Sequence, residues 1–475
     1  MNHREGSILV SLLWCLALLA VLVVGLLHST RLDLRIIKNY GDSIQARYLA
    51  LAGIEKAKAL LHQDMVDRSR SGNHHTSALY NSPQDFKDVS LGRGTFSVLR
   101  PGRSEDGGAV VFGIEDEESR LNVNTASAQE LSKLDRMLPE TAAAIIDFRD
   151  PDNNTTTGGA EGDYYASLRP PYLPRNGPFQ TVRELLWVRG VTRELFWGED
   201  ANQNGVLDPE ENDGNTSAPP DDRDGILDSG WSGFVTIDSS VKNTNASGQE
   251  RVDLATADEK ALTAVKGVTQ EVARAILARR DQKKFESLAD LLDLTSSPPP
   301  GVRNPSPGNN NSAGSPANAL VRGQTQATEG GGAQPQPNVG TSTSGAKLIT
   351  VEQLVQMADD LTTVSDQELA GVINVNTASP SVLSCLQGIT PEIAQAILNH
   401  RESSGYFANT VALLKVSGIS PDIFKGIHAR ISARSETFRI MSEGRVPSTG
   451  ARSRIQMIVH MDANGVRTLS CREDL

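Results

Sequence analysis

Oxygen-bearing side chains alternate along one short segment of the chain in a pattern typical of calcium-binding loops. Calcium takes roughly six to eight hard oxygen ligands, and alternate residues of a tight loop point theirs inward. The candidate ligands, at loop positions one, three, five, seven, nine and twelve, are Asp200, Asn202, Asn204, the carbonyl of Val206, Asp208 and Glu211. Gly205 at position six permits the sharp bend. The alternative is a solvated acidic loop. The turn-like residues that follow favour a structural clamp over an opening sensor.

A degenerate second loop comes directly afterwards. Its candidate ligands, at positions three, five, seven and nine, are Asp222, Asp224, the carbonyl of Ile226 and Asp228. Pro220 at position one and Trp231 at position twelve offer no side-chain ligand for calcium. The sequence therefore leaves a second calcium ion open.

A unit made of an extended lead, a helix, a tight turn and a second helix recurs three times. The leads are Arg120–Ala126, Arg251–Ala257 and Val372–Ser379, and the segments expected to dock after the second helices are Gly177–Leu186, Phe285–Leu292 and Tyr406–Leu414. These units are similar to helix-hairpin-helix motifs, in which N–H groups at a helix start hold a nucleic-acid phosphate.

The chemistry of the turns argues against nucleic-acid binding. The second glycine of the usual Gly-hydrophobic-Gly turn is absent, and Glu140, Glu271 and Glu392 follow closely. A net charge of -12 also disfavours broad contact with phosphates. We therefore expect the units to pack against one another, with DNA binding as the alternative.

An uncharged apolar run from Ile8 to Leu27 follows the short leader MNHREG. As a helix it is long enough to cross a bilayer. It is too long for an ordinary cleaved signal and lacks a clean small-x-small site. A prepilin-like leader cut between Gly6 and Ser7 fits, although Ser11 stands where prepilins usually carry Glu. A plain membrane anchor stays open.

The helix is expected to continue beyond the membrane, because no proline occurs between Arg31 and Gln63. Apolar residues recur there at helical spacing and should share one face, which we expect a sheet of the same chain to cover. They are Ile37, Tyr40, Ile44, Tyr48 and Leu51.

Strand patterns occur at both ends of the folded part. They cover 96–100 and 109–114, then 437–441, 453–461 and 466–470, with a hairpin turn at 462–465. Helical patterns between them predict one α/β domain interrupted by a large helical insertion. Residues 296–345 are too poor in apolar side chains to fold and are predicted to be a disordered linker, and 153–162 a shorter loop of the same kind.

Together, the leader without Glu, the segment EDEESRLNVNTA, the hairpin units and the calcium loop resemble the type II secretion system protein K family, the large minor pseudopilins. The resemblance implies an α+β fold, with an N-terminal transmembrane and amphipathic helix and a pilin-like α/β domain. A large all-α insertion of helix-hairpin-helix (SAM-like) repeats interrupts that domain.

The resemblance also implies how the protein is processed and what it binds. The prepilin peptidase would cut between Gly6 and Ser7, with methylation of the new N-terminus. The chain would remain in the inner membrane with its bulk in the periplasm. Calcium would be the cofactor, and the partners would be the minor pseudopilins I and J and the major pseudopilin, at the tip of the pseudopilus. The missing Glu suits a tip subunit, because no subunit above it needs that carboxylate.

The expected domain boundaries follow from these features. They are a leader at 1–6, a transmembrane helix at 7–28, an amphipathic helix at 29–63, the first part of the α/β domain at 64–119 with the calcium-loop region at 198–231, the insertion at 120–295 and 346–433, the linker at 296–345, and C-terminal strands at 434–475.

Nothing in the sequence indicates an enzyme. The eight histidines are scattered, and no triad or pair of catalytic carboxylates stands out. A membrane-anchored hydrolase assembled by the fold is a further alternative. Of the three cysteines, Cys385 and Cys471 could form a disulfide in an oxidising compartment, which the sequence leaves open.

Overall fold

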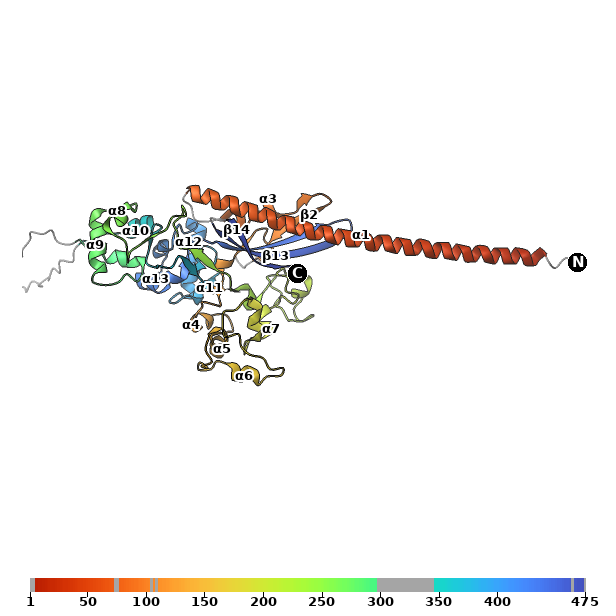
Figure 1. Cartoon of the computed structure of the whole chain (residues 1–475), viewed down its shortest axis with the longest axis horizontal. Coiled ribbons are helices and arrows are strands. Elements are labelled where there is room, and N and C mark those ends of the chain that lie inside the picture. Colours follow the sequence, from red (N-terminus) through yellow and green to blue (C-terminus); the bar gives the residue numbers. More distant parts are fainter. Residues whose placement is uncertain are drawn as a thin grey trace, which may run out of the picture.

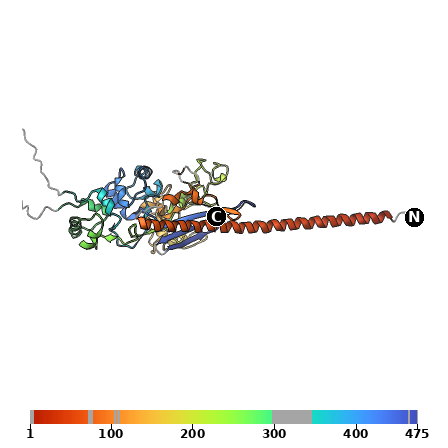
Figure 2. The same cartoon turned by 90° about the horizontal axis from the view of Figure 1, so that it is seen from above.

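A single long helix begins the described part of the chain. The computed structural model describes residues 5–71, 77–102, 106, 110–296, 346–462 and 465–473. Helix α1 runs without a break from Glu5 to Ser71. Its first half projects far beyond the body of the molecule in two perpendicular views (Figures 1 and 2). Among the described residues, α1 is the one helix long and apolar enough to cross a membrane.

The second half of α1 lies on an antiparallel sheet. The strands are β1 (Val89–Leu91), β2 (Gly94–Leu99), β12 (Thr437–Val446), β13 (Ala451–Asp462) and β14 (Gly465–Arg472), in that order, with β3 (Glu115–Asp116) also paired to β12. The three C-terminal strands predicted from the sequence are confirmed, and each is longer than predicted. Asp462 at the end of β13 pairs with Gly465 at the start of β14; residues 463–464 of the predicted hairpin turn lie outside the described residues.

The strand predicted at 109–114 is wrong. Val111 forms only an isolated bridge with Arg100. The segment instead forms hydrogen bonds with the short helix α2 (Ser77–Tyr80) and with the connection from α2 to the next short helix, α3 (Pro83–Phe86). Ile114 N–H donates to the Leu79 carbonyl at 3.0 Å, and the Phe112 carbonyl accepts from Ser82 N–H at 2.7 Å. These bonds use the backbone groups that a strand would need for its neighbour.

The sheet covers α1, but on a different face from the one predicted. The buried face carries the small residues Ala46, Ala50 and Ala57 together with the large residues Leu49, Ile54 and Leu61. Four residues of the predicted stripe, Ile37, Tyr40, Ile44 and Tyr48, are 41–70% exposed, whereas the fifth, Leu51, is half-buried against the core under the sheet. At about 100° of rotation per residue, the centre of this stripe lies roughly 130° around α1 from the centre of the buried face.

Close approach of the backbones decides which face is buried. A Cβ added at Gly444 on β12 would lie 2.0 Å from the Ala46 carbonyl oxygen, and one added at Gly53 on α1 would lie 2.2 Å from Ser442 Oγ. A side chain at either glycine would clash with its neighbour, so Gly53 and Gly444 allow α1 and β12 to approach closely along this face.

Between β3 and β12, the chain forms three repeats, and each repeat contains two hairpins. The first repeat holds β4 (Leu121–Asn122), α4 (Ala128–Leu131), α5 (Pro139–Arg149), α6 (Gly162–Ala166), η3 (Val182–Trp187), α7 (Arg193–Trp197) and β5 (Val235–Thr236). The second holds β7 (Val252–Asp253), α8 (Glu259–Ala264), α9 (Gln270–Arg280), η6 (Leu288–Asp293), α10 (Val351–Met357) and β8 (Leu361–Thr362). The third holds β10 (Ile373–Asn374), α11 (Pro380–Cys385), α12 (Pro391–Ser404), η7 (Thr410–Lys415), α13 (Pro421–Ile427) and β11 (Ile431–Ser432).

A short parallel strand pair closes each repeat: β4 with β5, β7 with β8, and β10 with β11. The lead of a repeat therefore lies beside its last residues. The middle repeat lies at the end of the body opposite the N-terminus (Figure 1). Buried apolar side chains of all three repeats form one continuous core.

The three segments predicted to dock after the second helices, 177–186, 285–292 and 406–414, begin a second hairpin in each repeat: they include most of η3, η6 and η7, which are followed by α7, α10 and α13. Gly190 and Gly418 have φ of +86° and +92°, like Gly267 and Gly388 in the predicted turns at +93° and +76°. In the middle repeat the predicted linker falls between η6 and α10, in the turn of the second hairpin. Residues 297–345 of that linker lie outside the described residues.

An acidic segment joins the sheet to the repeats. Glu117 is fully buried, forms an ion pair with Arg439 of β12 and accepts from Thr236 Oγ1 of the first repeat. Glu118 is also fully buried and accepts from Thr437 N–H at 3.2 Å. Burial and the nearby charge of Asp116 raise the pKa of Glu118 well above its usual value.

The two cysteines of the folded part lie in different surroundings. Cys385 is buried in the core of the repeats, whereas Cys471 is exposed on β14, and both thiols are free. The disulfide that the sequence left open is therefore not formed.

Candidate functional site

The loop from Asp200 to Glu211 folds around its own acidic and amide side chains. Asp200 is 4% exposed, and its two carboxylate oxygens accept from the N–H groups of Asn204 and Gly205 at 3.0 and 3.1 Å. Glu211 is 3% exposed and accepts from Ala201 N–H at 2.9 Å and Asp208 N–H at 3.1 Å. The first and last predicted ligands therefore bind the loop backbone from its two ends.

The middle ligands of this loop meet at Asp208. The side-chain amides of Asn202 and Asn204 each lie 2.7 Å from Asp208 Oδ2. Asn204 Oδ1 accepts from Val206 N–H at 2.7 Å. Gly205 has φ of +70°, which confirms the bend predicted at position six. The structure thus brings the predicted side chains of the first loop together.

Burial disfavours the ionised form of the two carboxylates at the ends of this loop, Asp200 and Glu211, unless a cation lies beside them. It raises the pKa of Asp200, and it raises the pKa of Glu211, to which the charge of Asp200 also contributes. Carboxylate, amide and carbonyl oxygens are the donors that calcium prefers. The donor chemistry of this loop therefore fits a calcium ion.

The second loop depends on a residue that the sequence did not single out. Glu199 accepts from Asp222 N–H and from Asp228 N–H, both at 3.3 Å, so its carboxylate joins the two ends of the loop. Asp224 N–H donates to Asp222 Oδ1, and Asp224 Oδ1 accepts from Ile226 N–H. Glu199 lies directly before the first loop, and this adjacency was the only signal available in the sequence.

The first loop also faces the sheet. A cleft of about 340 Å³ is lined by the loop, by α7 and by strands β12 to β14. Arg472 on β14 donates to the Gln203 carbonyl at 3.3 Å. The loop therefore bridges the repeat region and the sheet. Trp197 and Arg183 lie on the same cleft, with Arg183 5.3 Å from the ring centre of Trp197.

Five of the six hairpin turns direct a side-chain hydroxyl to the helix that follows, whereas Leu138 at the first turn provides no side-chain cap for α5. Thr269 and Thr390 accept from N–H groups in the first turns of α9 and α12, and Ser420 caps α13 in the same way. The apolar turn residues Val268 and Ile389 are buried. A hydroxyl thus satisfies one of the N–H groups with which a phosphate would interact.

The proposed processing site lies at the start of α1. The backbone of Gly6 and Ser7 is helical and belongs to the segment that extends away from the body. The apolar side chains that follow, from Leu9 onward, are exposed. Apolar stem, sheet and hairpin insertion together define a class: a mixed helix and strand protein with an N-terminal apolar helix and helix-hairpin-helix motifs.

Comparison with known proteins finds family matches to parts of the chain. Residues 119–197 match the type II secretion system protein K family, and residues 247–296 and 370–432 match the helix-hairpin-helix motif. The chain is 28% identical over 210 residues to type II secretion system protein K of Klebsiella pneumoniae, covering 41% of this chain and 61% of that relative. It is 28% identical over 199 residues to protein K of Pseudomonas aeruginosa, covering 38% and 56%.

A solved structure was also compared. The GspK-GspI-GspJ complex of the type 2 secretion system of enterotoxigenic Escherichia coli matches with a TM-score of 0.39 and 11% identity, over 94% of this chain and 98% of that chain. The family match over residues 119–197 confirms the resemblance expected from the sequence: the chain carries a type II secretion system protein K domain. Its alignments span about three fifths of the length of the protein K relatives.

Proposed function

We propose that this protein is a minor pseudopilin of a type II secretion system, with a structural role and no catalytic one. It is anchored in the inner membrane by α1, and its sheet and repeats lie in the periplasm. The match to protein K supports this role, and so does the form of α1, whose apolar first half is exposed while one face of its second half is buried on the sheet.

The exposed stripe on α1 is the observation that carries the proposal. Ile37, Tyr40, Ile44 and Tyr48 form a continuous apolar strip just beyond the membrane-spanning part, on the side away from the sheet. Large exposed apolar patches mark interaction surfaces. The stripe would therefore take the helices of the minor pseudopilins I and J, with the major pseudopilin below.

A position at the tip of the pseudopilus follows from the other end of the molecule. The three repeats form a wide head around and beyond the sheet (Figure 1). Such a head leaves no room for another subunit above it. Ser11, in place of the usual Glu, removes a carboxylate that only a subunit stacked above would need. In this role, the prepilin peptidase cuts the chain between Gly6 and Ser7, and the new N-terminus is methylated. The assembled pseudopilus tip then aids export of folded proteins across the outer membrane.

Calcium belongs to the proposal as a structural ion. Asp200, Asn202, Asn204, Asp208, Glu211 and the carbonyl of Val206 would hold one ion, and a second would involve Asp222, Asp224, Asp228, the carbonyl of Ile226 and Glu199. The ion would neutralise carboxylates that burial disfavours as anions. It would also fix the loop that bridges the repeats and β14.

DNA binding is the second candidate, because residues 247–296 and 370–432 match the helix-hairpin-helix motif. The capped and acidic turns oppose it. A gel-shift titration of the full chain in detergent separates the two functions. Tight, salt-sensitive binding of duplex DNA would support a membrane-anchored DNA-binding protein, and absence of a shift at micromolar protein favours the pseudopilin.

The main test is co-isolation of the tagged full chain from detergent-solubilised membranes that contain the minor pseudopilins I and J. We expect Ile44→Glu combined with Tyr48→Glu to lose both partners, since two charges would be buried at the contact. Ser43→Glu adds a charge on another exposed face of the same helix turn and should retain them. Equal recovery of I and J with all three chains would contradict the proposed assembly.

A further inference from the structure

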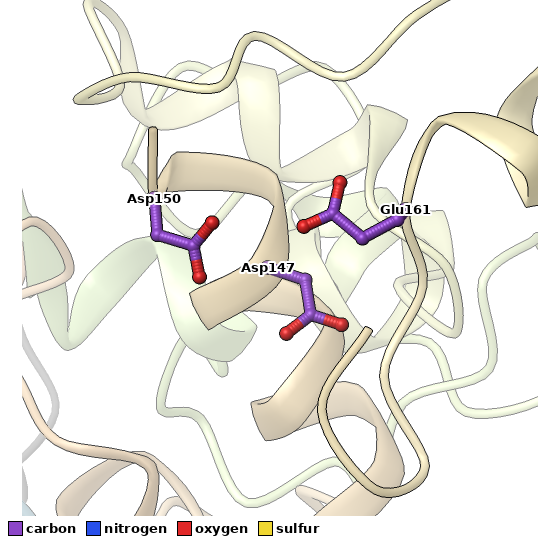
Figure 3. A group of neighbouring side chains, drawn as sticks. All are labelled: Asp147, Asp150 and Glu161. Carbon is purple, nitrogen blue, oxygen red and sulfur yellow. The ribbon is translucent and has the colours of Figure 1, made fainter. Parts of the chain in front are cut away.

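Three carboxylates outside the predicted loops meet at the C-terminal end of α5. Asp147 lies in the last turn of this helix, Asp150 is its C-cap, and Glu161 is the N-cap of α6. One oxygen from each residue lies within 4.8 Å of the other two. Figure 3 shows the carboxylates of Asp150 and Glu161 turned toward each other, with Asp147 between them in the view.

The protein supplies too few partners for this negative charge. Glu161 is 4% exposed, and neither of its carboxylate oxygens has a hydrogen-bond partner among the described residues. Asp150 Oδ1 is likewise buried without a partner there. A buried carboxylate that has lost its water is strongly destabilising unless a cation or donors replace that water.

The nearest basic side chain in the sequence is used elsewhere. The Arg149 guanidinium donates to the carbonyl oxygens of Val123 and Ala126, in the lead of the first repeat. The C-terminal end of a helix is also the negative end of its dipole, so acids there are unfavourable. Burial, followed by the charges of Asp150 and Asp147, raises the pKa of Glu161 to about 7.

The loop between α5 and α6 is built around this cluster, contrary to the unstructured loop expected at 153–162. Thr156 donates to Asp147 through its hydroxyl at 2.7 Å and its N–H at 3.2 Å. A Cβ added at Gly159 would lie 2.0 Å from Asp147 Oδ2, so a glycine is needed for the loop to approach the carboxylate. Ala160 is also buried. The loop thus holds Glu161 against the end of α5.

We propose that Asp147, Asp150 and Glu161 form a calcium site, separate from the loops at 200–231, that fastens the end of α5 to the start of α6. Calcium–oxygen distances of about 2.3–2.6 Å allow ligand oxygens on opposite sides of the ion to lie roughly 5 Å apart, whereas the shorter distances of magnesium require a tighter group. Carbonyl oxygens of the loop and water complete the coordination. This inference does not depend on the role in secretion.

The test counts calcium ions bound to the full chain in detergent, by equilibrium dialysis after chelator treatment. Glu161→Gln keeps the shape of the side chain and removes the ligand charge. Asp163→Asn removes a charge from an exposed acid two residues away and is the matched control. Both changes are made in the natural chain and in Asp200→Ala, so that the loop site and this site are counted separately.

We expect Glu161→Gln to bind about one Ca²⁺ fewer than its parent in both backgrounds, with Asp163→Asn unchanged. Glu161→Gln should also lose part of the calcium-induced rise in melting temperature, without a fall in the melting temperature in chelator. An unchanged ion count would overturn the inference. So would an equal fall in melting temperature with and without calcium, because that result assigns Glu161 a purely structural role. An unchanged number of bound calcium ions in Asp200→Ala would contradict the proposed calcium site in the 200–211 loop and would leave the site at Glu161 unaffected.

Discussion

Asn376 and Phe407 are joined by a reciprocal pair of hydrogen bonds in the third repeat. Asn376 Nδ2 donates to the Phe407 carbonyl at 3.0 Å, and Phe407 N–H donates to Asn376 Oδ1 at 2.7 Å. Asn124 and Phe179 form the same pair in the first repeat, at 3.0 and 2.8 Å. In each case the amide in the lead of a repeat holds the start of its second hairpin.

The middle repeat lacks this pair, because Ala255 occupies the position of the asparagine. An arginine contact at the end of the second helix is kept in all three. Arg401 donates to the carbonyls of Val375 and Ala378, and Arg280 donates to the Ala257 carbonyl in the middle repeat. The first and third repeats thus have both the asparagine pair and the arginine contact, whereas the second repeat has only the arginine contact.

Replacing Asn376 by alanine should therefore destabilise the third repeat. The change leaves the buried N–H and carbonyl of Phe407 without partners, which costs roughly 1–3 kcal/mol. Urea denaturation followed by circular dichroism measures the loss. Asn399→Ala is the same substitution at an exposed position of α12 and should change the free energy of unfolding by less than about 0.5 kcal/mol. Equal effects of the two would disprove the role of the pair.

Two glycines of α1 should respond in opposite directions to alanine. At Gly41 nothing lies within 4 Å of an added Cβ, so alanine should stabilise the helix by about 0.5–1 kcal/mol. At Gly53 the Cβ would lie 2.2 Å from Ser442 Oγ and 2.9 Å from Phe96 Cδ2, so alanine should destabilise by about 1–3 kcal/mol. Thermal unfolding of both variants in mild detergent checks the signs. A gain in stability at Gly53 would show that α1 and the sheet are not in close contact there.

Asp200→Ala should lower the melting temperature in calcium and leave it unchanged, or slightly higher, in chelator. Without an ion, Asp200 is a desolvated acid, as its raised pKa indicates, and it stabilises the loop only through backbone hydrogen bonds. Glu210→Ala, at an exposed position of the same loop that is not a predicted ligand, is the control. An equal fall in melting temperature in calcium and in chelator would show that Asp200 does not bind a metal ion in this loop.

His428 should contribute a loss of stability on acidification. Burial, with the charge of Arg251, lowers the pKa of this imidazole to about 4. Its Nδ1 is buried without a partner among the described residues, and Nε2 lies 3.1 Å from Thr363 Oγ1. Below the unfolded pKa of about 6.5, the unfolded chain takes up a proton that the folded chain refuses.

The contribution of His428 to stability is therefore complete above about pH 6.5, falls as the pH is lowered toward 4, and levels off below the folded pKa. Melting temperatures of the natural chain and His428→Gln between pH 7 and 4 test this. The variant should lose less stability over that range, whereas the exposed His62→Gln should follow the natural chain. Parallel curves for all three would show that His428 is protonated as easily in the folded state as in the unfolded state.

The sequence determined the features that depend on local pattern. Length and hydropathy predicted the apolar helix from Ile8, and alternation predicted the C-terminal strands. The recurrence of NVNTA-like leads predicted the repeats, and Gly205 predicted the bend of the acidic loop. Each of these follows from a pattern within one short segment, or from the recurrence of such a pattern along the chain, so no knowledge of spatial partners was needed.

Only the tertiary structure decided which surfaces meet. The stripe from Ile37 to Leu51 has the spacing of a buried helix face, yet its members from Ile37 to Tyr48 are exposed. The close approach to the sheet at Gly53 and Gly444 lies on another face of α1. Glu199 acquired a role because the fold brings Asp222 and Asp228 to its carboxylate. Asp147, Asp150 and Glu161 converge because Gly159 lets a loop return onto α5. Burial and close approach are properties of segments that are distant in sequence, and local periodicity carries no information about them.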